Sequence, residues 1–250
     1  MSRGPQSPSH AAHGRQSFGR RHGRPLRPSA RAALDAVLPR ISIDLPPDGA
    51  SLDLDAVFGC ADSATPTPPL WLEIGFGAGE HLAWQAAQNP GVRLIGAEVF
   101  LQGVARLVRQ VEEHGLGNLR IFRGDARALL AALPAGTLER VFILFPDPWP
   151  KTRHHKRRIV QRETLDRLAV LMPAGAELRL ATDDPGYRAW MLERLNAHPA
   201  FEWLARGPAD WRRRPDDWPP TRYEAKALAQ GRAPVYLRFR RRLNPGETGY

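Results

Sequence analysis

The stretch "LWLEIGFGAGEHLAWQAAQ", residues 70–88, gives the strongest indication of the fold. An apolar run suited to a buried strand leads into three alternating glycines, Gly75, Gly77 and Gly79, and then into a segment with helical spacing of apolar residues. Glycine permits a tight turn between strand and helix and lets a ligand approach the backbone closely. The stretch therefore predicts a strand, a ligand-accessible turn and a helix.

The same alternation continues along the chain. Strand candidates follow at "RLIGAEV", "LRIFRGD", "VFILFPD" and "ELRLATDD", and the segments between them have helical spacing. Strands that alternate with helices form βαβ units, so we expect an α/β fold with a doubly wound, mostly parallel sheet. The late segments "FEWLA" and "VYLRFRRR" suit an antiparallel hairpin that closes the sheet. We expect one domain over residues 35–250.

Acidic residues stand within or just after each predicted strand. In strand order they are Glu73, Glu98, Asp125, Asp147 and the pair Asp183 and Asp184. Open α/β sheets bind ligands beyond the carboxyl ends of their strands. These acids therefore mark the predicted binding edge.

The glycine turn does not match a dinucleotide site. Its spacing is G-x-G-x-G rather than G-x-G-x-x-G, and Glu73 and Glu80 flank it with no Lys or Arg. That charge suits a pyrophosphate poorly and suits S-adenosylmethionine, which carries an ammonium and a sulfonium, well. Glu98 is placed to accept hydrogen bonds from ribose hydroxyls, and Asp125 from the adenine amine. Either acid alone also fits a helix N-cap.

Asp147 lies in the unusual segment "FPDPWPK". Pro146, Pro148 and Pro150 fix φ and remove backbone donors, so this loop is stiff and cannot continue the sheet. A rigid acid at the reactive end of a cofactor suits chemistry. The alternative is that Asp147 only terminates a strand and Trp149 packs into the core.

The composition favours a polyanionic partner. The 250 residues contain 36 Lys and Arg against 26 Asp and Glu, giving a net charge of +10 and a sequence pI near 10.8. Cys60 is the only cysteine, which excludes an intrachain disulfide and a cysteine-based zinc site, and we expect no metal. Without an apolar run of about 18 residues we expect no membrane span and a cytoplasmic protein.

Residues 1–34 contain seven arginines, three histidines and no acid. We interpret them as a disordered basic arm that contacts phosphates. A solubilising tail and an organellar transit peptide have the same composition and stay open as alternatives.

Four motifs carry a family resemblance. "LEIGFGAGEHL", "FILFPDPWPKTRHHKRR", "LRLATDD" and "TRYE" resemble the tRNA (guanine-N7-)-methyltransferase family, and "RQSFGRRHGR" extends the match toward the N-terminus. The proline motif with its basic run is far more specific than the glycine turn. The resemblance implies a seven-stranded class I methyltransferase fold. It also implies methyl transfer from S-adenosylmethionine to N7 of the variable-loop guanine at tRNA position 46, leaving S-adenosylhomocysteine. A monomer and a homodimer are both open.

The resemblance also implies roles for individual residues. The expected cofactor contacts are Glu73, Gly75, Gly77, Gly79, Glu98, Asp125 and Asp147, with Asp147 also catalytic. The expected substrate contacts are Lys151, Asp183, Thr221, Arg222, Tyr223 and Glu224. The expected RNA contacts are Arg153, His154, His155, Lys156, Arg157 and Arg158. Arg222 and Tyr223 stand where the family often has Lys and Phe. "TRYE" also fits a helix capping box, which leaves the role of Thr221 open.

Three other functions remain to be weighed. A methyltransferase acting on an exocyclic amine uses a proline loop after the same strand, but typically in the order Asn/Asp-Pro-Pro-aromatic. A non-catalytic RNA-binding module has no need of Glu98, Asp125 and Asp147 together. A nicotinamide dehydrogenase is disfavoured by the glycine spacing.

Overall fold

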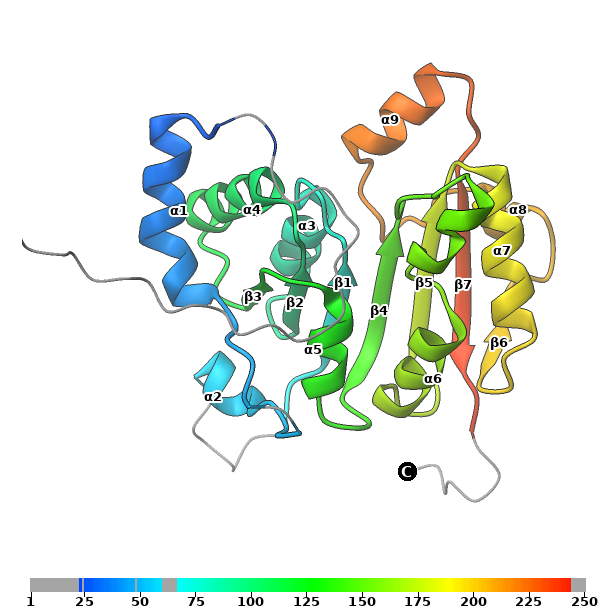
Figure 1. Ribbon diagram of the computed structural model, residues 1–250, viewed down its shortest axis with the longest axis horizontal. Helices are drawn as coiled ribbons and strands as arrows, with labels where there is room; N and C mark the ends of the chain where they lie inside the picture. Colours follow the sequence, from blue (N-terminus) through cyan, green and yellow to red (C-terminus); the bar gives the residue numbers. More distant parts are fainter. Residues whose placement is uncertain (1–22, 24, 48, 60–66, 244–250) are drawn as a thin grey trace, which may run out of the picture.

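The computed structural model describes residues 23, 25–47, 49–59 and 67–243, and a single sheet forms their centre (Figure 1). Its strands are β1 Leu70–Ile74, β2 Arg93–Ala97, β3 Leu119–Phe122, β4 Leu138–Leu144, β5 Glu177–Thr182, β6 Phe201–Trp203 and β7 Val235–Arg241. The strand order is β3-β2-β1-β4-β5-β7-β6. Strands β1 to β5 pair in parallel, and β7 runs antiparallel to both β5 and β6. The predicted α/β sheet with its antiparallel hairpin is confirmed.

Helices cover both faces of this sheet. The described helices are α1 Pro28–Ile41, α2 Leu54–Phe58, α3 Glu80–Gln88, α4 Leu101–His114, α5 Ala126–Ala132, the 3-10 helix η1 Thr152–Arg157, α6 Arg162–Leu171, α7 Pro185–Asn196, α8 Ala209–Arg212 and α9 Arg222–Ala229. The side chains of α5, α6 and α7 share one buried cluster, and those of α1, α3 and α4 share the other. The fold is therefore doubly wound.

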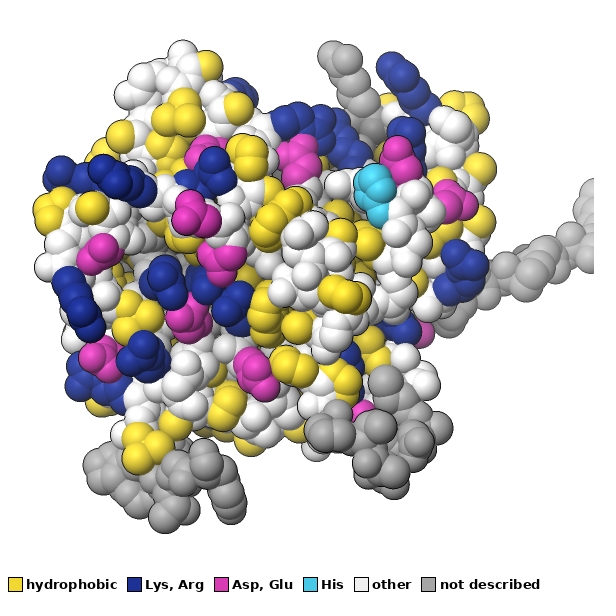
Figure 2. Space-filling view, turned by 180° about the vertical axis from the view of Figure 1, so that it is seen from behind, with side chains coloured by type: hydrophobic (Ala, Val, Ile, Leu, Met, Phe, Trp, Pro, Cys, Tyr) yellow, Lys and Arg dark blue, Asp and Glu magenta, His cyan; other side chains and the backbone are white. Residues whose placement is uncertain are grey.

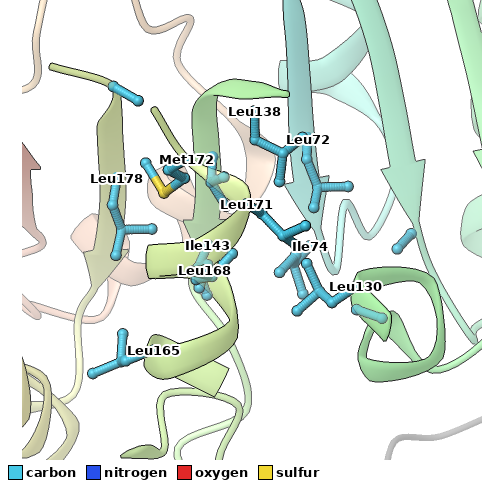
Figure 3. Close-up of a cluster of buried hydrophobic side chains, with 14 of the residues drawn as sticks. Leu72, Ile74, Leu130, Leu138, Ile143, Leu165, Leu168, Leu171, Met172 and Leu178 are labelled. Atoms are coloured by element: carbon cyan, nitrogen blue, oxygen red, sulfur yellow. The ribbon is translucent and has the colours of Figure 1, made fainter. Parts of the chain in front are cut away.

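The first cluster shows how alternation along a strand builds the core. Leu72 and Ile74 of β1 lie in one cluster with Leu130 of α5 and with Leu168 and Leu171 of α6 (Figure 3). Trp71, between Leu70 and Leu72, belongs to the opposite cluster. Each fully buried leucine of this kind contributes about 2–3 kcal/mol to folding. This packing fixes the ends of the parallel strands along one edge.

Helix α1 begins inside the segment that was predicted to be a disordered arm. It starts at Pro28, and its buried face is Leu34, Val37 and Ile41. The prediction of disorder was wrong for residues 28–34, because a stripe with helical spacing is hidden among arginines and alanines and packs in the same cluster as α4. Residues 1–22 and Cys60 lie outside the described residues.

Loop chemistry sets where the later helices begin. Asp184 accepts a hydrogen bond from the Tyr187 backbone N–H at 2.6 Å and so caps α7, with Pro185 in the first turn. Helix α9 lies beyond the ends of β4 and β5, at the same edge as the loops that follow these strands (Figure 1). No helix within the described ranges is long and apolar enough to cross a membrane.

Candidate functional site

The glycine turn after β1 has the geometry that its sequence predicted. Gly75, Gly77 and Gly79 have φ of 74°, 56° and 77°, a region that glycine enters without strain. Helix α4 approaches the turn so closely that a Cβ on Gly103 would lie 2.0 Å from the Gly77 carbonyl oxygen. Sequence reasoning missed Gly103, since its requirement arises only when α4 packs against the turn.

Glu98 joins the glycine turn to the end of β2. Its Oε2 accepts a hydrogen bond from the Gly77 N–H at 2.8 Å, and its Oε1 accepts from the N–H groups of Val99 and Phe100. Burial raises the pKa of Glu98 above its ordinary value; the three backbone hydrogen bonds act against this, and the charge of Asp147 adds to it. Glu98 and Asp147 therefore act on one another across the predicted site.

Glu73 lies inside β1, and its side chain is buried. Its Oε2 lies 2.8 Å from Nδ1 of His81, and both side chains are only 3% exposed. Gln85 continues this chain: its amide nitrogen lies 3.2 Å from His81 Nε2 and donates to the Asp217 carbonyl at 2.7 Å. The predicted cofactor acid thus has a buried imidazole partner that sequence reasoning did not identify.

Asp125 caps helix α5, as the alternative interpretation expected. Its Oδ1 accepts from the Arg127 N–H at 3.0 Å, and the Arg127 guanidinium lies 3.2 Å from its Oδ2. A capping carboxylate still has lone pairs at the strand edge, so the N-cap role and adenine recognition are compatible.

The loop that carries Asp147 is held in an unusual conformation. Phe145 and Trp149 are the described non-glycine residues with positive φ, 49° and 44°, and they flank Asp147 on either side. Such residues persist only where the surroundings enforce them, and they cluster at functional sites. The side chain of Asp147 is exposed, yet partial desolvation raises its pKa above the ordinary value. This favours a functional carboxylate over a simple strand terminator.

The basic run after the loop forms the short helix η1. Lys151, Arg153 and Lys156 are exposed, and the Arg157 guanidinium lies 4.9 Å from the centre of the Trp149 ring. The ring of His154 also meets Trp149 edge-on, whereas that of His155 packs against Trp190.

Arg158 does not fit the predicted RNA contact. It is 3% exposed, and its Nε donates to the Pro148 carbonyl at 2.8 Å. Its guanidinium carbon lies 4.9 Å from the Tyr187 ring centre and 4.6 Å from that of Trp190. The turn at the end of η1 directs this side chain inward, so its position does not support the predicted RNA contact by Arg158.

The "TRYE" segment begins helix α9 and meets the site from the opposite side. Thr221 caps the helix by accepting from the Glu224 N–H at 3.2 Å. The Glu224 carboxylate turns inward, where it accepts from Arg214 Nε and the Tyr236 hydroxyl, so only half of a capping box forms. This inward position does not support the predicted substrate contact by Glu224.

Two residues of α9 reach the start of α3, beside the glycine turn, and the loop that carries Asp147. The Arg222 backbone N–H and guanidinium both donate to Glu80, which offsets one of the two negative charges predicted beside the glycine turn. The Tyr223 ring centre lies 5.5 Å from that of Phe145. Burial and the charges of Asp183 and Asp147 raise the pKa of Tyr223, so these acids lie on the same edge. Asp183 is itself paired with Arg232 at 2.6 Å.

The local geometry fits S-adenosylmethionine. Apart from each glycine and its two chain neighbours, no described heavy atom lies within 4 Å of the position that a Cβ would take at Gly75 or Gly77, so the turn faces open space. The Glu98 carboxylate borders this turn through the Gly77 N–H, in keeping with a cofactor that bears positive charge and hydrogen-bond donors. Among the described side chains, no group of three or more His, Cys, Asp or Glu residues is placed to hold a metal ion.

The surface over β5, β7 and β6 carries charges of both signs. Seen from behind, Lys and Arg side chains interleave with Asp and Glu side chains over the side that contains β5, β7 and β6 (Figure 2). Ion pairs there include Arg238 with Glu177 and Arg179 with Asp217. Within the described part of the chain, by contrast, no ion pair joins Lys151, Arg153 or Lys156 to an acid.

Comparison with solved structures defines the class of protein. The 16S rRNA methyltransferase KamB aligns with 76% of this chain and 94% of its own at a TM-score of 0.52 and 16% identity. A 16S rRNA (adenine(1408)-N(1))-methyltransferase variant from Catenulisporales acidiphilia, solved with cosubstrate SAM, covers 80% of this chain and 96% of its own, with a TM-score of 0.52 and 18% identity. The fold is that of the class I methyltransferases, and the family described as "Putative methyltransferase" matches residues 67–237.

Curated relatives define the family more narrowly. The tRNA (guanine-N(7)-)-methyltransferase of Rhodospirillum rubrum is 49% identical over 98% of this chain and 94% of its own. That of Paramagnetospirillum magneticum is 49% identical over 90% of this chain and 92% of its own. The chain belongs to the tRNA (guanine-N(7)-)-methyltransferase family.

Proposed function

We propose that this protein transfers a methyl group from S-adenosylmethionine to N7 of the variable-loop guanine in tRNA. The observation that carries the proposal is the placement of Asp147: a rigid loop presents it at the strand edge that bears the cofactor acids, and the basic helix η1 follows at once. The family relationship agrees with this chemistry.

The reaction needs no obligatory general base. Guanine N7 has an available lone pair and no proton to lose, so catalysis is mainly in-line positioning and stabilisation of charge. The methylated base is a cation, so a fixed carboxylate nearby becomes more favourable as methyl transfer proceeds. Asp147 supplies this charge and accepts hydrogen bonds from the N1–H and amino edge of the guanine.

On the cofactor side, this chain provides carboxylates at fixed positions. S-adenosylmethionine supplies the electrophilic methyl group when it is bound. Glu98 accepts hydrogen bonds from the ribose hydroxyls, Asp125 from the adenine amine and Glu73 from the ammonium group. The backbone contacts of Glu98 and the cap made by Asp125 support these assignments, because they fix the orientation of both carboxylates.

On the substrate side, Tyr223 and Phe145 offer ring faces to the target base, with Asp183 acting on Tyr223 and Lys151 at the start of η1. The exposed cations of η1 neutralise phosphates of the tRNA. Thr221 acts chiefly as the cap that starts α9 and thereby sets the position of Tyr223.

The direct test uses unmodified tRNA. The protein is incubated with S-adenosylmethionine and tRNA transcripts, and the digested nucleosides are identified by mass spectrometry. N7-methylguanosine is expected, and its position is read by sequencing. A methylated exocyclic amine in its place, or no product where calorimetry shows that the cofactor binds, would overturn the proposal.

The cellular setting and assembly state are also proposals. We propose a cytoplasmic enzyme that acts as a monomer or a homodimer. Light scattering coupled to gel filtration, with and without tRNA, distinguishes the two states.

A further inference from the structure

Arg158 is a buried cation at the end of an exposed basic run. The preceding cations Lys151, Arg153 and Lys156 are exposed, whereas Arg158 is 3% exposed. Burying a guanidinium costs free energy unless its surroundings compensate, so its position calls for a local reason.

The surroundings of Arg158 hold its guanidinium from the α7 side. The rings of Tyr187 and Trp190 lie 4.9 Å and 4.6 Å from its central carbon, and cation–π attraction offsets part of the lost hydration. Both rings are themselves fixed: Trp190 Nε1 donates to the Val160 carbonyl at 2.7 Å, and Tyr187 is fully buried. Burial lowers the pKa of Arg158; the charge of Asp184, at the start of α7, acts against this, and that of Arg194 adds to it.

The other side of Arg158 meets the loop that carries Asp147. Its Nε donates to the carbonyl of Pro148, the residue directly after Asp147. Prolines at 146, 148 and 150 remove three backbone donors from this loop, so its carbonyls depend on donors from elsewhere. The positive φ of Trp149 adds strain that such an external contact must overcome.

A second arginine, Arg127, connects Arg158 to Asp125 at the start of α5. Arg127 lies 3.2 Å from the Asp125 carboxylate through Nη1 and 3.3 Å from the Arg158 carbonyl oxygen through Nη2. The backbone of Arg158 is thus tied to the end of β3, while its side chain is tied to the loop after β4. Sequence spacing gives no hint of either contact.

We propose that Arg158 is a positioning residue for methyl transfer, which holds the Pro148 carbonyl and thereby places Asp147, and that it makes no contact with tRNA. The inference rests on the proposed function for its rate effect. The proposal gives Arg158 a different role from the exposed cations of the same basic run.

The test compares two identical charge changes five positions apart, Arg158→Gln and Arg153→Gln. For Arg158→Gln, kcat at saturating tRNA and cofactor should fall about tenfold or more, because a misplaced catalytic group loses rate steeply. Its Kd for tRNA should stay within about twofold, and the slope of log K against log salt should be unchanged. Arg153→Gln should instead weaken binding and reduce that slope by about 1. Arg158→Lys, which retains a donor, should recover part of kcat.

Circular dichroism at the assay temperature shows whether Arg158→Gln is folded, and so whether a lower rate reflects a displaced Asp147 or loss of the fold. If Arg158→Gln does not fold, Trp190→Leu removes one of the two rings that hold the guanidinium and should lower kcat with the same unchanged salt slope. Unchanged kcat in folded Arg158→Gln would overturn the proposal, as would a weaker tRNA affinity with a flatter salt slope. A wild-type protein that forms no N7-methylguanosine would count against the proposed function instead. In that case the salt slope of Arg158→Gln still decides whether Arg158 contacts tRNA.

Discussion

The Glu98 carboxylate accepts a hydrogen bond from the Gly77 backbone N–H at 2.8 Å, across 21 residues of sequence. This contact links the end of β2 to the glycine turn after β1. One carboxylate can thus shape the turn and face the cofactor, and its Oε1 is satisfied by Val99 and Phe100. A substitution at Glu98 should therefore affect cofactor binding in two ways at once.

We expect Glu98→Gln to weaken S-adenosylmethionine binding at least about tenfold, since hydrogen bonds to a charged group are worth about 1.5–3 kcal/mol each. Calorimetric titration with the cofactor measures this, and tRNA affinity should change little. Glu112→Gln, at an exposed position of α4, makes the same charge change and serves as the control. Equal cofactor affinities in the two variants would refute the assigned role of Glu98.

Gly103→Ala tests the close approach of α4 to the glycine turn. The added Cβ would lie 2.0 Å from the Gly77 carbonyl oxygen, so helix or turn must move. We expect a loss of about 1–3 kcal/mol in the free energy of unfolding and weaker cofactor binding, because overpacking displaces backbone. Gly117→Ala is the matched control, since its Cβ meets no described atom within 4 Å. Denaturant titration of both variants should separate them.

His81→Leu tests the buried partner of Glu73. The change replaces the imidazole with an apolar side chain and leaves the Glu73 carboxylate without its contact at 2.8 Å. We expect the free energy of unfolding to fall by about 1–3 kcal/mol, the cost of an unsatisfied buried polar group. His114→Leu, at an exposed position of α4, should change it by less than about 0.5 kcal/mol. Equal stabilities would mean that the pair contributes nothing to folding.

The sequence predicts the sheet well because its signals are local. Apolar runs, glycines at every second position and acids after strands each act within a few residues, so the succession of β1 to β5 along the chain and their parallel pairing could be inferred. Their spatial order comes from the structure. Helix α1 was hidden because its three buried residues stand in a segment with a disorder-like composition.

The site was harder to predict, because several of its contacts join distant segments. Arg222 meets Glu80 across 142 residues, and no spacing rule connects them. Arg158 looks like its neighbours in sequence, and only the packing of α7 against the end of η1 buries it. Residue type identified the acids, whereas their partners, such as His81 and Arg127, follow from the fold.

We expect the exposed cations of η1 to govern the salt dependence of tRNA binding. Replacing Lys151 and Lys156 together with Gln should reduce the slope of log K against log salt by about 2, since each removes one phosphate contact. Arg240→Gln is the control: it is exposed, and its strand partner Glu177 begins β5, so it lies at the edge opposite the site. Filter binding across a salt series measures the slopes. A double variant with the wild-type slope would show that these lysines do not meet phosphates.

The pH dependence of the methyl-transfer rate should follow the fraction of Asp147 that is ionised. Desolvation raises its pKa above the ordinary 3.8, and only the carboxylate stabilises the cationic product. The rate should therefore be highest above this raised pKa and fall as the pH drops through it. Asp147→Asn should lower kcat by about 10²–10³-fold and remove this acid limb, with tRNA affinity nearly unchanged. Single-turnover rates at saturating tRNA and cofactor measure the profile, and Asp216→Asn, at an exposed loop position, should retain the limb. An Asn variant with the wild-type rate and profile would exclude a catalytic charge at Asp147.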